Sequence, residues 1–261
     1  MSYRTKECLE QAKLSYELEI NNVLRYETNE YIIIKDFVET NMHKRSFLIK
    51  IPKNNNIKNC IFFFHGSRDL HFDVAINSTN LLHENFIVVY FQGNNQGIYN
   101  LEYPHLHKHY GYVSFGENFF EIRHNTDNFK DDIEYVKLVR DKILEGYNIE
   151  KFYIVSHSNG AVFSCLLPIF LPDMFEKIFN HQGGMGYDEW FNIPFELLKE
   201  NDKKTPIQFY TGTLDVHLNP CIQAHKIFTN EGFESSIFIK EGEKHSYNKN
   251  CEEHIFNYFL N

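Results

Sequence analysis

Ser158 stands at the centre of a Ser-x-Ser-x-Gly pattern that begins at Ser156 and ends at Gly160. An apolar run at 152–155 precedes the pattern, and another apolar run begins at Ala161. This order predicts a buried strand, a very tight turn and a helix. The small residues at both ends of the pattern let the strand and the helix approach closely. The turn would hold Ser158 at its tip, which is the position of a serine nucleophile.

An acidic residue and a histidine follow two later predicted strands. Asp215 comes just past the strand expected at 207–210, and His245 lies in the loop expected between the last strand and the last helix. With Ser158 they follow the Ser, Asp, His order of one serine-hydrolase architecture. Each has a plainer interpretation, because Asp215 could cap the helix that starts near Pro220 or face solvent, and His245 could be one solvated histidine among 14. The joint order favours a catalytic triad.

Backbone donors for an oxyanion are expected next to the first buried strand. The strand predicted at 60–64 ends in His65-Gly66-Ser67. A His-Gly pair at a strand end leaves a backbone N–H free to point into the crevice, and with the N–H of Asn159 it would form an oxyanion hole. The alternative is an ordinary turn glycine.

Short apolar runs alternate with helical patterns along most of the chain. Two strands joined by a polar turn around Asn41 come first, and five apolar strands with helices between them follow. The strands are expected at 31–34, 46–51, 60–64, 86–91, 152–155, 207–210 and 236–239. The helices are expected at about 72–83, 127–145, 160–167, 220–229 and after 250. Alternation of this kind predicts an α/β fold, in which a mostly parallel central sheet carries helices on both faces. In such folds the sites lie beyond the carboxyl ends of the strands, which is where the residues named above occur.

The size and charge of the chain argue against some classes of function. Residues 1–261 fit one large α/β domain, and no Pro-, Gly- or Ser-rich linker divides them. A net charge of −9 without a concentrated basic patch argues against nucleic-acid binding. The start lacks an apolar signal-peptide core, no apolar run approaches the ~18 residues that span a bilayer, and the five cysteines are scattered. These features predict a cytoplasmic protein with free thiols and no membrane partner.

Residues 7–24 have the apolar spacing of an amphipathic helix. Such a helix would pack on the domain or on a second subunit. A docking or dimerisation role, and with it a homodimer, is therefore a hypothesis that stands alongside catalysis.

A histidine-rich stretch reads His105-x-His107-x-His109. Alternating histidines on a strand share a face and could bind a transition metal. Pro104 lies beside them and no acidic or cysteine residue stands at ligand spacing, so a polar loop is favoured. We expect neither a metal nor an organic cofactor.

From about residue 45 to the C-terminus the chain resembles the α/β-hydrolases. Within them it is most similar to the esterase branch that contains polyhydroxybutyrate-depolymerase-like and feruloyl-esterase-like proteins. The resemblance rests on FFFHGS at 62–67, VVYFQG at 88–93, the helix at 131–143 that leads into YNIEKFYIVSHSNGA, TGTLD at 211–215 and KHSY at 244–247. It implies Ser158 as nucleophile, His245 as base, Asp215 as the residue that orients the base, and the backbone N–H groups of Ser67 and Asn159 as the oxyanion hole.

The chain departs from the family pattern in several places. Glycines often follow the His-Gly pair in the family, whereas Arg68 and Asp69 stand here. Arg68 would bring a cation near the pocket, and we expect it, with His157 beside the nucleophile, to contact the substrate. Residues 1–40 form an N-terminal helical and strand extension outside the resemblance, and about 95–124 is a candidate lid insertion.

Together these features predict a serine hydrolase that cleaves carboxylic esters through an acyl-enzyme formed on Ser158. The missing export signal favours a small intracellular ester or acyl conjugate over an extracellular polymer, and Arg68 favours an anionic group in it. A peptidase or a thioesterase would use the same triad. A non-catalytic binding protein on the same fold is the other alternative, although a binder has no need of all three residues.

Overall fold

The computed structural model describes most of the chain from residue 14 onwards. The described residues are 14–15, 17–19, 21–53, 56–67, 69–78, 81, 83–95, 118–185, 196–247 and 251–261. Several predictions fall outside them: Arg68, the histidines of the 105–109 stretch, most of the candidate lid and half of the N-terminal helix predicted at 7–24.

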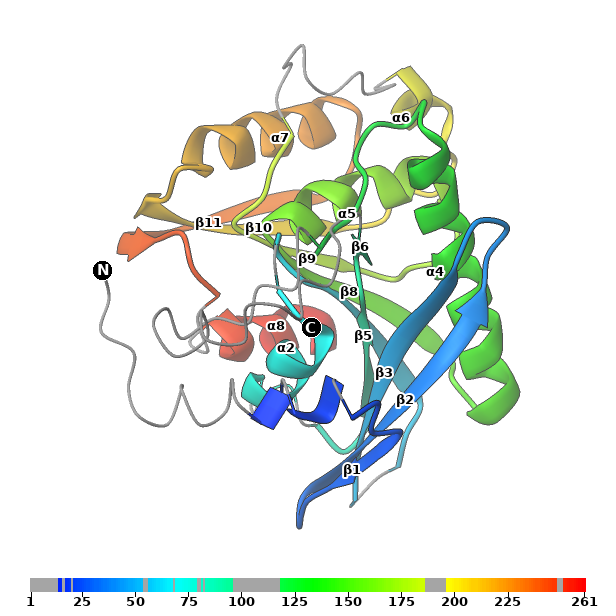
Figure 1. The fold of residues 1–261 in the computed structure, drawn as a ribbon. Coiled ribbons are helices and arrows are strands. Elements are labelled where there is room, and N and C mark those ends of the chain that lie inside the picture. The colour runs from blue at the N-terminus through cyan, green and yellow to red at the C-terminus, as the bar shows by residue number, and fades with distance from the viewer. Residues whose placement is uncertain are drawn as a thin grey trace.

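Among the described residues, a nine-stranded sheet forms the centre of the molecule (Figure 1). Its strands lie in the order β1 (Arg25–Glu27), β2 (Tyr31–Glu39), β3 (Lys44–Pro52), β5 (Phe86–Phe91), β4 (Asn59–Phe64), β8 (Lys151–His157), β9 (Ile178–His181), β10 (Ile207–Leu214) and β11 (Ser235–Lys244). The pairs from β1 to β5 are antiparallel, and the pairs from β5 to β11 are parallel. A separate short pair joins β6 (Asn94–Asn95) to β7 (Asn118–Phe119). The parallel strands bring their carboxyl ends to one edge of the sheet.

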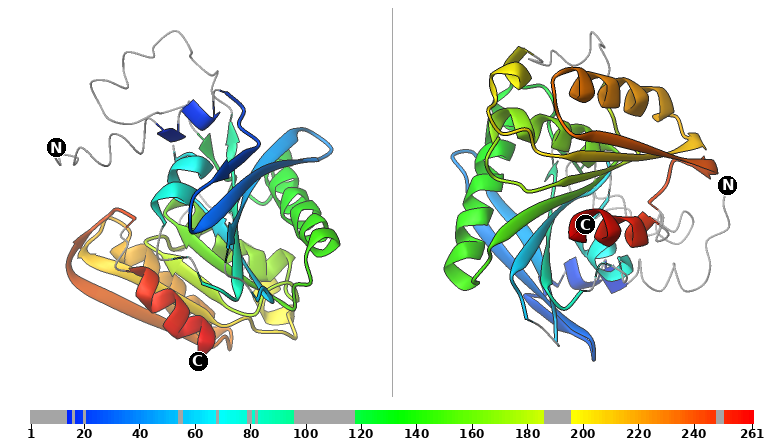
Figure 2. Two further views of the ribbon diagram at one scale, coloured as in Figure 1. Left: turned by 90° about the horizontal axis from the view of Figure 1, so that it is seen from below. Right: turned by 180° about the vertical axis from the view of Figure 1, so that it is seen from behind.

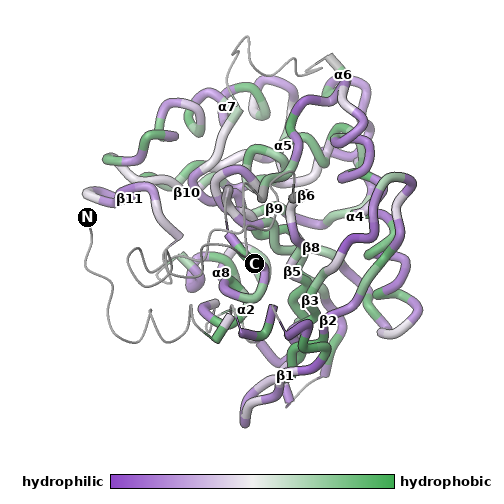
Figure 3. The backbone as a smooth tube through the Cα atoms, in the orientation of Figure 1, coloured by the Kyte–Doolittle hydropathy of each residue, from purple (hydrophilic) through white to green (hydrophobic). Residues whose placement is uncertain are grey.

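Helices cover both faces of this sheet (Figure 2). The described helices are α2 (His71–Asn77), α4 (Asp127–Gly146), α5 (Asn159–Phe170), α6 (Glu196–Glu200), α7 (Leu218–Asn230) and α8 (Glu252–Leu260). Successive strand side chains point to opposite faces, so Phe62 and Phe64 join the core beneath α4, α5 and α7, whereas Phe63 joins the core beneath α2 and α8. Hydrophobic residues accordingly run along the central strands, and the surface helices alternate in hydropathy (Figure 3).

Two helices show how local sequence sets their limits. Thr126 caps α4, because its hydroxyl accepts a hydrogen bond from the Phe129 N–H at 3.1 Å, and Asp127 adds an acid to the first turn. α5 is apolar on nearly all sides because it is buried, and it tolerates Pro168 near its C-terminal end. The Leu171 N–H still closes the last turn on the Leu167 carbonyl at 2.7 Å.

The architecture confirms the predicted α/β fold with a mostly parallel sheet and helices on both faces. It also differs from the sequence-based expectation in detail. The strands β1 and β9 were not predicted, and β9 is only four residues long with polar Asn180 and His181 in it. β11 continues to Lys244, so His245 is the first residue of the loop between β11 and α8, and the strand ends later than the expected 239. α2 ends at Asn77, earlier than the expected 83.

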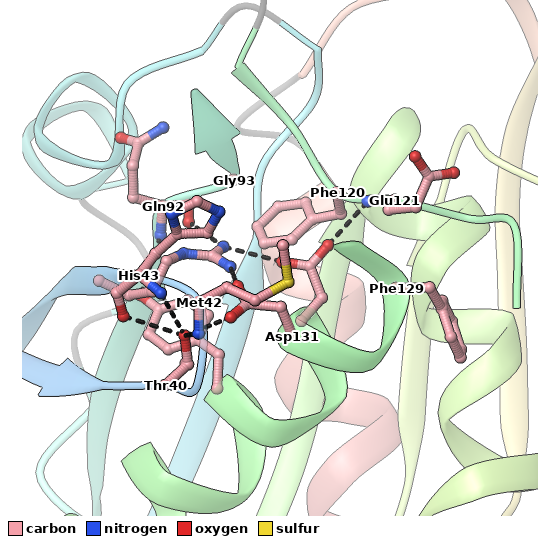
Figure 4. A network of polar contacts seen from close by, with 12 residues as sticks. Thr40, Met42, His43, Gln92, Gly93, Phe120, Glu121, Phe129 and Asp131 are labelled. Carbon is pink, nitrogen blue, oxygen red and sulfur yellow. Dashed lines mark hydrogen bonds and ion pairs between the residues drawn. The ribbon is translucent and has the colours of Figure 1, made fainter. Parts of the chain in front are cut away.

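A buried ion cluster fixes the β2–β3 hairpin against α4 (Figure 4). Arg45 of β3 pairs with Asp131 at 2.7 Å and with Asp132 at 2.8 Å, and its guanidinium carbon lies 4.2 Å from the centre of the Tyr135 ring. The Thr40 hydroxyl also donates to Asp131. Burial raises the pKa of Asp132 to about 6, although the charge of Arg45 opposes the rise. Removing one partner would leave another charge buried and unpaired, so the cluster holds its elements together.

The same cluster reaches two segments beside the carboxyl end of the sheet (Figure 4). The Glu121 N–H, two residues past β7, donates to Asp132 Oδ2 at 2.7 Å. Arg45 Nη2 donates to the Gln92 carbonyl, just past β5, at 2.9 Å. The ion cluster therefore positions backbone that lies next to the predicted site.

The described part of the N-terminal segment packs against the domain. Leu18 is buried in the core beneath α2 and α8, and Glu19 accepts hydrogen bonds from Lys35 Nζ at 3.0 and 3.1 Å. Packing on the domain thus holds for these residues, whereas the homodimer stays a hypothesis. Within the described part of the chain, none of the helices has the length and apolar character needed to cross a membrane.

Candidate active site

Ser158 occupies the sharp turn between β8 and α5. Its backbone has a φ of 52° and a ψ of −116°, a strained conformation for a residue with a side chain. The Ser158 N–H donates to the His181 carbonyl at 3.0 Å, and the Gly160 N–H donates to the His65 carbonyl at 3.0 Å. A Cβ on Gly160 would lie 2.3 Å from the Phe64 carbonyl oxygen. A glycine is therefore required for the helix to start this close to β4.

Ser156 fills the first position of the elbow, where its hydroxyl is buried but bonded. Its Oγ lies 2.8 Å from Ser164 Oγ on α5, and Ser164 donates onward to the Ala161 carbonyl at 2.9 Å. Because the hydroxyl has a partner, burying it carries little penalty. A serine can thus stand where glycine is usual.

The three predicted triad side chains meet at the carboxyl end of the sheet. His245 Nε2 lies 2.9 Å from Ser158 Oγ, and His245 Nδ1 lies 3.0 Å from Asp215 Oδ1. Asp215 also accepts from the His217 N–H at 2.8 Å and from the Thr211 hydroxyl at 3.2 Å. Burial raises the pKa of Asp215, but the hydrogen bonds from His245 and the His217 N–H outweigh it and hold the pKa below its usual value. An ionised carboxylate only accepts, so Nδ1 of His245 carries the proton and Nε2 can accept from the Ser158 hydroxyl.

Two further imidazoles lie against the ring of His245. The His157 ring centre is 5.4 Å away with the planes at 25°, and the His217 ring centre is 4.8 Å away at 50°. His157 Nδ1 lies 3.1 Å from His181 Nδ1, so one of these nitrogens donates to the other. Burial lowers the pKa of both flanking rings, and nearby histidine charge lowers it further. Neutral rings on both sides do not repel an imidazolium at His245.

His157 was predicted to contact the substrate. The structure stacks its ring against that of His245, with 7% of the residue exposed and Nδ1 bonded to His181. A contact between His157 and a substrate therefore stays a prediction, and so does the role of Arg68.

The predicted oxyanion loop is held by the buried ring of His65. Its Nε2 accepts from the Gly93 N–H at 3.0 Å, so its Nδ1 carries the proton and donates to the Gly66 carbonyl at 2.6 Å. Burial lowers the pKa of His65 to about 4, which keeps the ring neutral. The Gly66 N–H donates to Asp69 Oδ2 at 3.1 Å. Because the C=O and N–H of a trans peptide point in opposite directions, the hold on the Gly66 carbonyl turns the Ser67 N–H away from His65.

The side chain of Asn159 anchors the segment that follows β7. Its Oδ1 accepts from the Phe120 N–H at 2.7 Å, and its Nδ2 donates to the Phe120 carbonyl at 3.1 Å. The Phe120 ring stacks on Phe163 at 5.4 Å and lies 5.0 Å from the His65 ring. The Asn159 backbone N–H starts α5, where first-turn N–H groups lack acceptors within the helix. The oxyanion role of Ser67 and Asn159 stays a prediction.

Three buried residues at the site were not predicted from the sequence. They are His181 at the end of β9, Gln182 directly after it and Glu243 near the end of β11, with 0%, 0% and 8% of their surfaces exposed. The run at 178–181 is short and half polar, so it does not stand out as a strand. The pair Gly183 and Gly184 was the one available sign of a tight loop there.

Within the described residues, no group of three or more His, Cys, Asp and Glu side chains is arranged to hold a metal ion. The arrangement combines a serine on a strained turn, an imidazole with a free acceptor nitrogen and an ionised carboxylate behind it. These are the parts of nucleophilic acyl transfer.

Comparisons with known proteins identify the fold. Searches against protein-family models and against curated proteins find no significant match. An S-formylglutathione hydrolase from Agrobacterium tumefaciens matches with a TM-score of 0.67 and 11% identity, over 90% of this chain and 97% of its own. A ferulic acid esterase matches with a TM-score of 0.60 and 14% identity, over 87% of this chain and 96% of its own. A fluorophosphonate-binding serine hydrolase from Staphylococcus aureus matches with a TM-score of 0.63 and 11% identity, over 89% of this chain and 100% of its own. The chain is similar to these proteins in fold, and that fold is the α/β-hydrolase fold.

Proposed function

We propose that this protein is a serine hydrolase that cleaves carboxylic esters of small molecules through an acyl-enzyme on Ser158. The observation that carries the proposal is the continuous series of hydrogen bonds from Asp215 through His245 to Ser158. The strained turn at Ser158 supports it, because such strain is kept where a side chain must be presented. The esterase and hydrolase names among similar folds agree with it.

In this proposal each member of the triad has one task. His245 Nε2 takes the proton of Ser158 as Oγ attacks the ester carbonyl carbon, and Asp215 stabilises the imidazolium that forms. The Ser67 and Asn159 N–H groups would receive the oxyanion, each contributing about 3 kcal/mol by analogy with removal of single donors. His245 then returns the proton to the leaving alcohol, and the ester bond breaks. Water, deprotonated by the same ring, releases the acid from Ser158.

A fluorophosphonate probe tests the nucleophile. We expect it to label the wild-type protein at Ser158 and to leave Ser158→Ala unlabelled, with kcat for a model ester lower by up to ~10⁶. Ser236→Ala, which removes an exposed serine on β11, is the matched control and should label like the wild type. No labelling of the wild type, or unchanged turnover in Ser158→Ala, contradicts the proposal.

A substrate panel separates the ester proposal from its alternatives. Oxygen esters of varied acyl length and charge would be compared with a thioester and an amide of the same acyl group. Fastest turnover of the oxygen esters supports the proposal, and a preference for the thioester or the amide assigns the same triad to another acyl transfer. A panel that includes anionic and neutral acyl groups also tests the expected role of Arg68. A protein that turns over none of them, but gains thermal stability with a ligand, is a binding protein.

A further inference from the structure

Behind the triad, the chain makes a tight turn at Gln182, directly after β9. Gln182 is fully buried and has a φ of 55°, which is uncommon for a residue with a side chain. Its N–H donates to the Tyr210 carbonyl at 2.8 Å. A Cβ on the next residue, Gly183, would lie 2.5 Å from the Ser158 carbonyl oxygen. The turn therefore lies directly against the backbone of the nucleophile.

The side-chain amide of Gln182 bonds the backbone on both sides of His245. Its Oε1 accepts from the Ser246 N–H at 2.7 Å, and its Nε2 donates to the Lys244 carbonyl at 2.9 Å. A carbonyl needs a donor and an N–H needs an acceptor, so these two partners set the orientation of the amide. The amide thus does for residues 244–246 what a neighbouring strand would do.

A buried carboxylate strengthens this assignment of the amide nitrogen. Gln182 Nε2 also donates to Glu243 Oε1 at 3.3 Å. Glu243 accepts from the Tyr210 hydroxyl at 3.2 Å, and it lies 3.5 Å from Lys240 Nζ and 3.7 Å from His181 Nε2. The His181 ring holds the pKa of Glu243 below its usual range, so the carboxylate is ionised and faces Gln182 as an acceptor.

We propose that Gln182 is a positioning residue of the triad, which fixes the imidazole of His245 by clamping the backbone before and after it. The preceding residue, His181, accepts the Ser158 N–H through its carbonyl at 3.0 Å. One short segment after β9 therefore sets the nucleophile and the base relative to each other. The inference rests on the proposed serine-hydrolase chemistry, because it assigns a role within that site.

The first test removes the three hydrogen bonds of the Gln182 amide and keeps a side chain of similar shape. Gln182→Met should lower kcat by about 10- to 100-fold with little change in KM, because small displacements of a catalytic group are costly. Fluorophosphonate labelling should slow by a similar factor. The control is Gln208→Met, since Gln208 Nε2 donates to Ser236 Oγ at 3.3 Å between the neighbouring strands β10 and β11. The control should keep wild-type kcat.

The second variant, Gln182→Glu, distinguishes positioning from a general loss of packing. A protonated carboxyl group has one donor and one acceptor and can replace the amide, whereas an ionised one repels Glu243 and cannot donate to Lys244. Its pKa should be raised by burial and by Glu243, although Lys240 and a protonated His181 would oppose the rise. The ratio of kcat in Gln182→Glu to kcat in Gln182→Met should therefore increase as the pH falls. A ratio that does not change with pH contradicts the clamp.

Two results distinguish failure of this inference from failure of the proposed function. If the wild type is labelled and active while folded Gln182→Met keeps kcat within about twofold, the inference is overturned and the hydrolase proposal stands. If the wild type is inactive, the proton NMR resonance of the His245 Nδ1–H, which is bonded to Asp215, still tests the inference about Gln182. A low-field resonance present in the wild type and lost or broadened in Gln182→Met supports the clamp, and an unchanged resonance overturns it.

Discussion

One oxygen atom of Asp215 receives two hydrogen bonds, from the His245 ring and from the backbone N–H of His217. The backbone donor holds the carboxylate in place independently of the ring. The Nδ1–H of the ring therefore keeps a fixed acceptor while a proton moves to and from Nε2. The orientation of Asp215 is thus set by the start of α7.

Asp215→Asn should lower kcat by about 10⁴, because an amide nitrogen facing Nδ1 favours the ring tautomer that carries its proton on Nε2. That tautomer cannot accept the proton of Ser158. The check is steady-state turnover of a model ester, with Asp173→Asn, an exposed residue, as the control. A variant that keeps more than a tenth of the wild-type kcat would show that Asp215 does not orient the base.

At this scale the positions of Ser158, Asp215 and His245 could be predicted because each comes after an apolar run. The exact strand ends could not, since β10 and β11 continue to residues 214 and 244, past the expected 210 and 239. The structure brings Ser158, Asp215 and His245 together, while their chemistry stays a proposal. Gln182 and Glu243 could not be found in the same way. Their importance depends on the register between β9, β10 and β11, which no local pattern records.

At the scale of secondary-structure elements, the site depends on the close approach of β4, β8 and α5. Gly160 lies where α5 crosses the end of β4, and the atoms that a Cβ at Gly160 would meet are backbone atoms of Phe64 and His65. Backbone cannot move aside as a flexible side chain would. The tight turn at Ser158 therefore requires a residue without a Cβ at position 160.

Gly160→Ala should destabilise the protein by about 1–3 kcal/mol or more, because overpacking outweighs the better helix propensity of alanine. Gly146→Ala in α4 is the matched control, since a Cβ there would meet nothing within 4 Å. It should be neutral or stabilising by up to ~1 kcal/mol. Urea unfolding midpoints compare the two, and equal midpoints would contradict the close approach.

Elements were predicted best where they are long or strongly apolar. The strands β4, β5 and β8 and the helix α4 match their expected positions to within a few residues. β9 was missed because it is short and because its polar residues, Asn180 and His181, are buried and bond residues that are distant in the sequence. Local propensity carries no information about such partners.

For the whole molecule, the buried cluster of Arg45, Asp131 and Asp132 makes stability depend on pH. The pKa of Asp132 is raised to about 6 in the folded protein, above its usual value of 3.8. A raised carboxyl pKa means that the folded state holds the proton more tightly than the unfolded state does. Its contribution to stability is complete below about pH 4 and is lost as the pH rises through about 6.

Asp132→Asn removes this titration. The free energy of unfolding of the wild type, measured relative to that of the variant, should fall on the order of 2–3 kcal/mol between pH 4 and pH 7. The difference between the two proteins isolates Asp132 because the other carboxyl groups are common to both. Denaturant unfolding at several pH values provides the measurement. A difference that is constant or grows with pH would show that Arg45 keeps Asp132 ionised throughout.

The Ser156 hydroxyl is bonded to Ser164 on α5, the helix that follows the elbow. This pair affects how proteins with such an elbow are recognised from their sequences. Ser156 and Ser164 are hydrogen-bonded to each other, so the serine at 164 supplies a buried partner for a serine at 156. A search pattern that insists on glycine before the nucleophile would pass over chains built with this pair. A pattern that admits serine there, together with a serine eight positions later, would retain them.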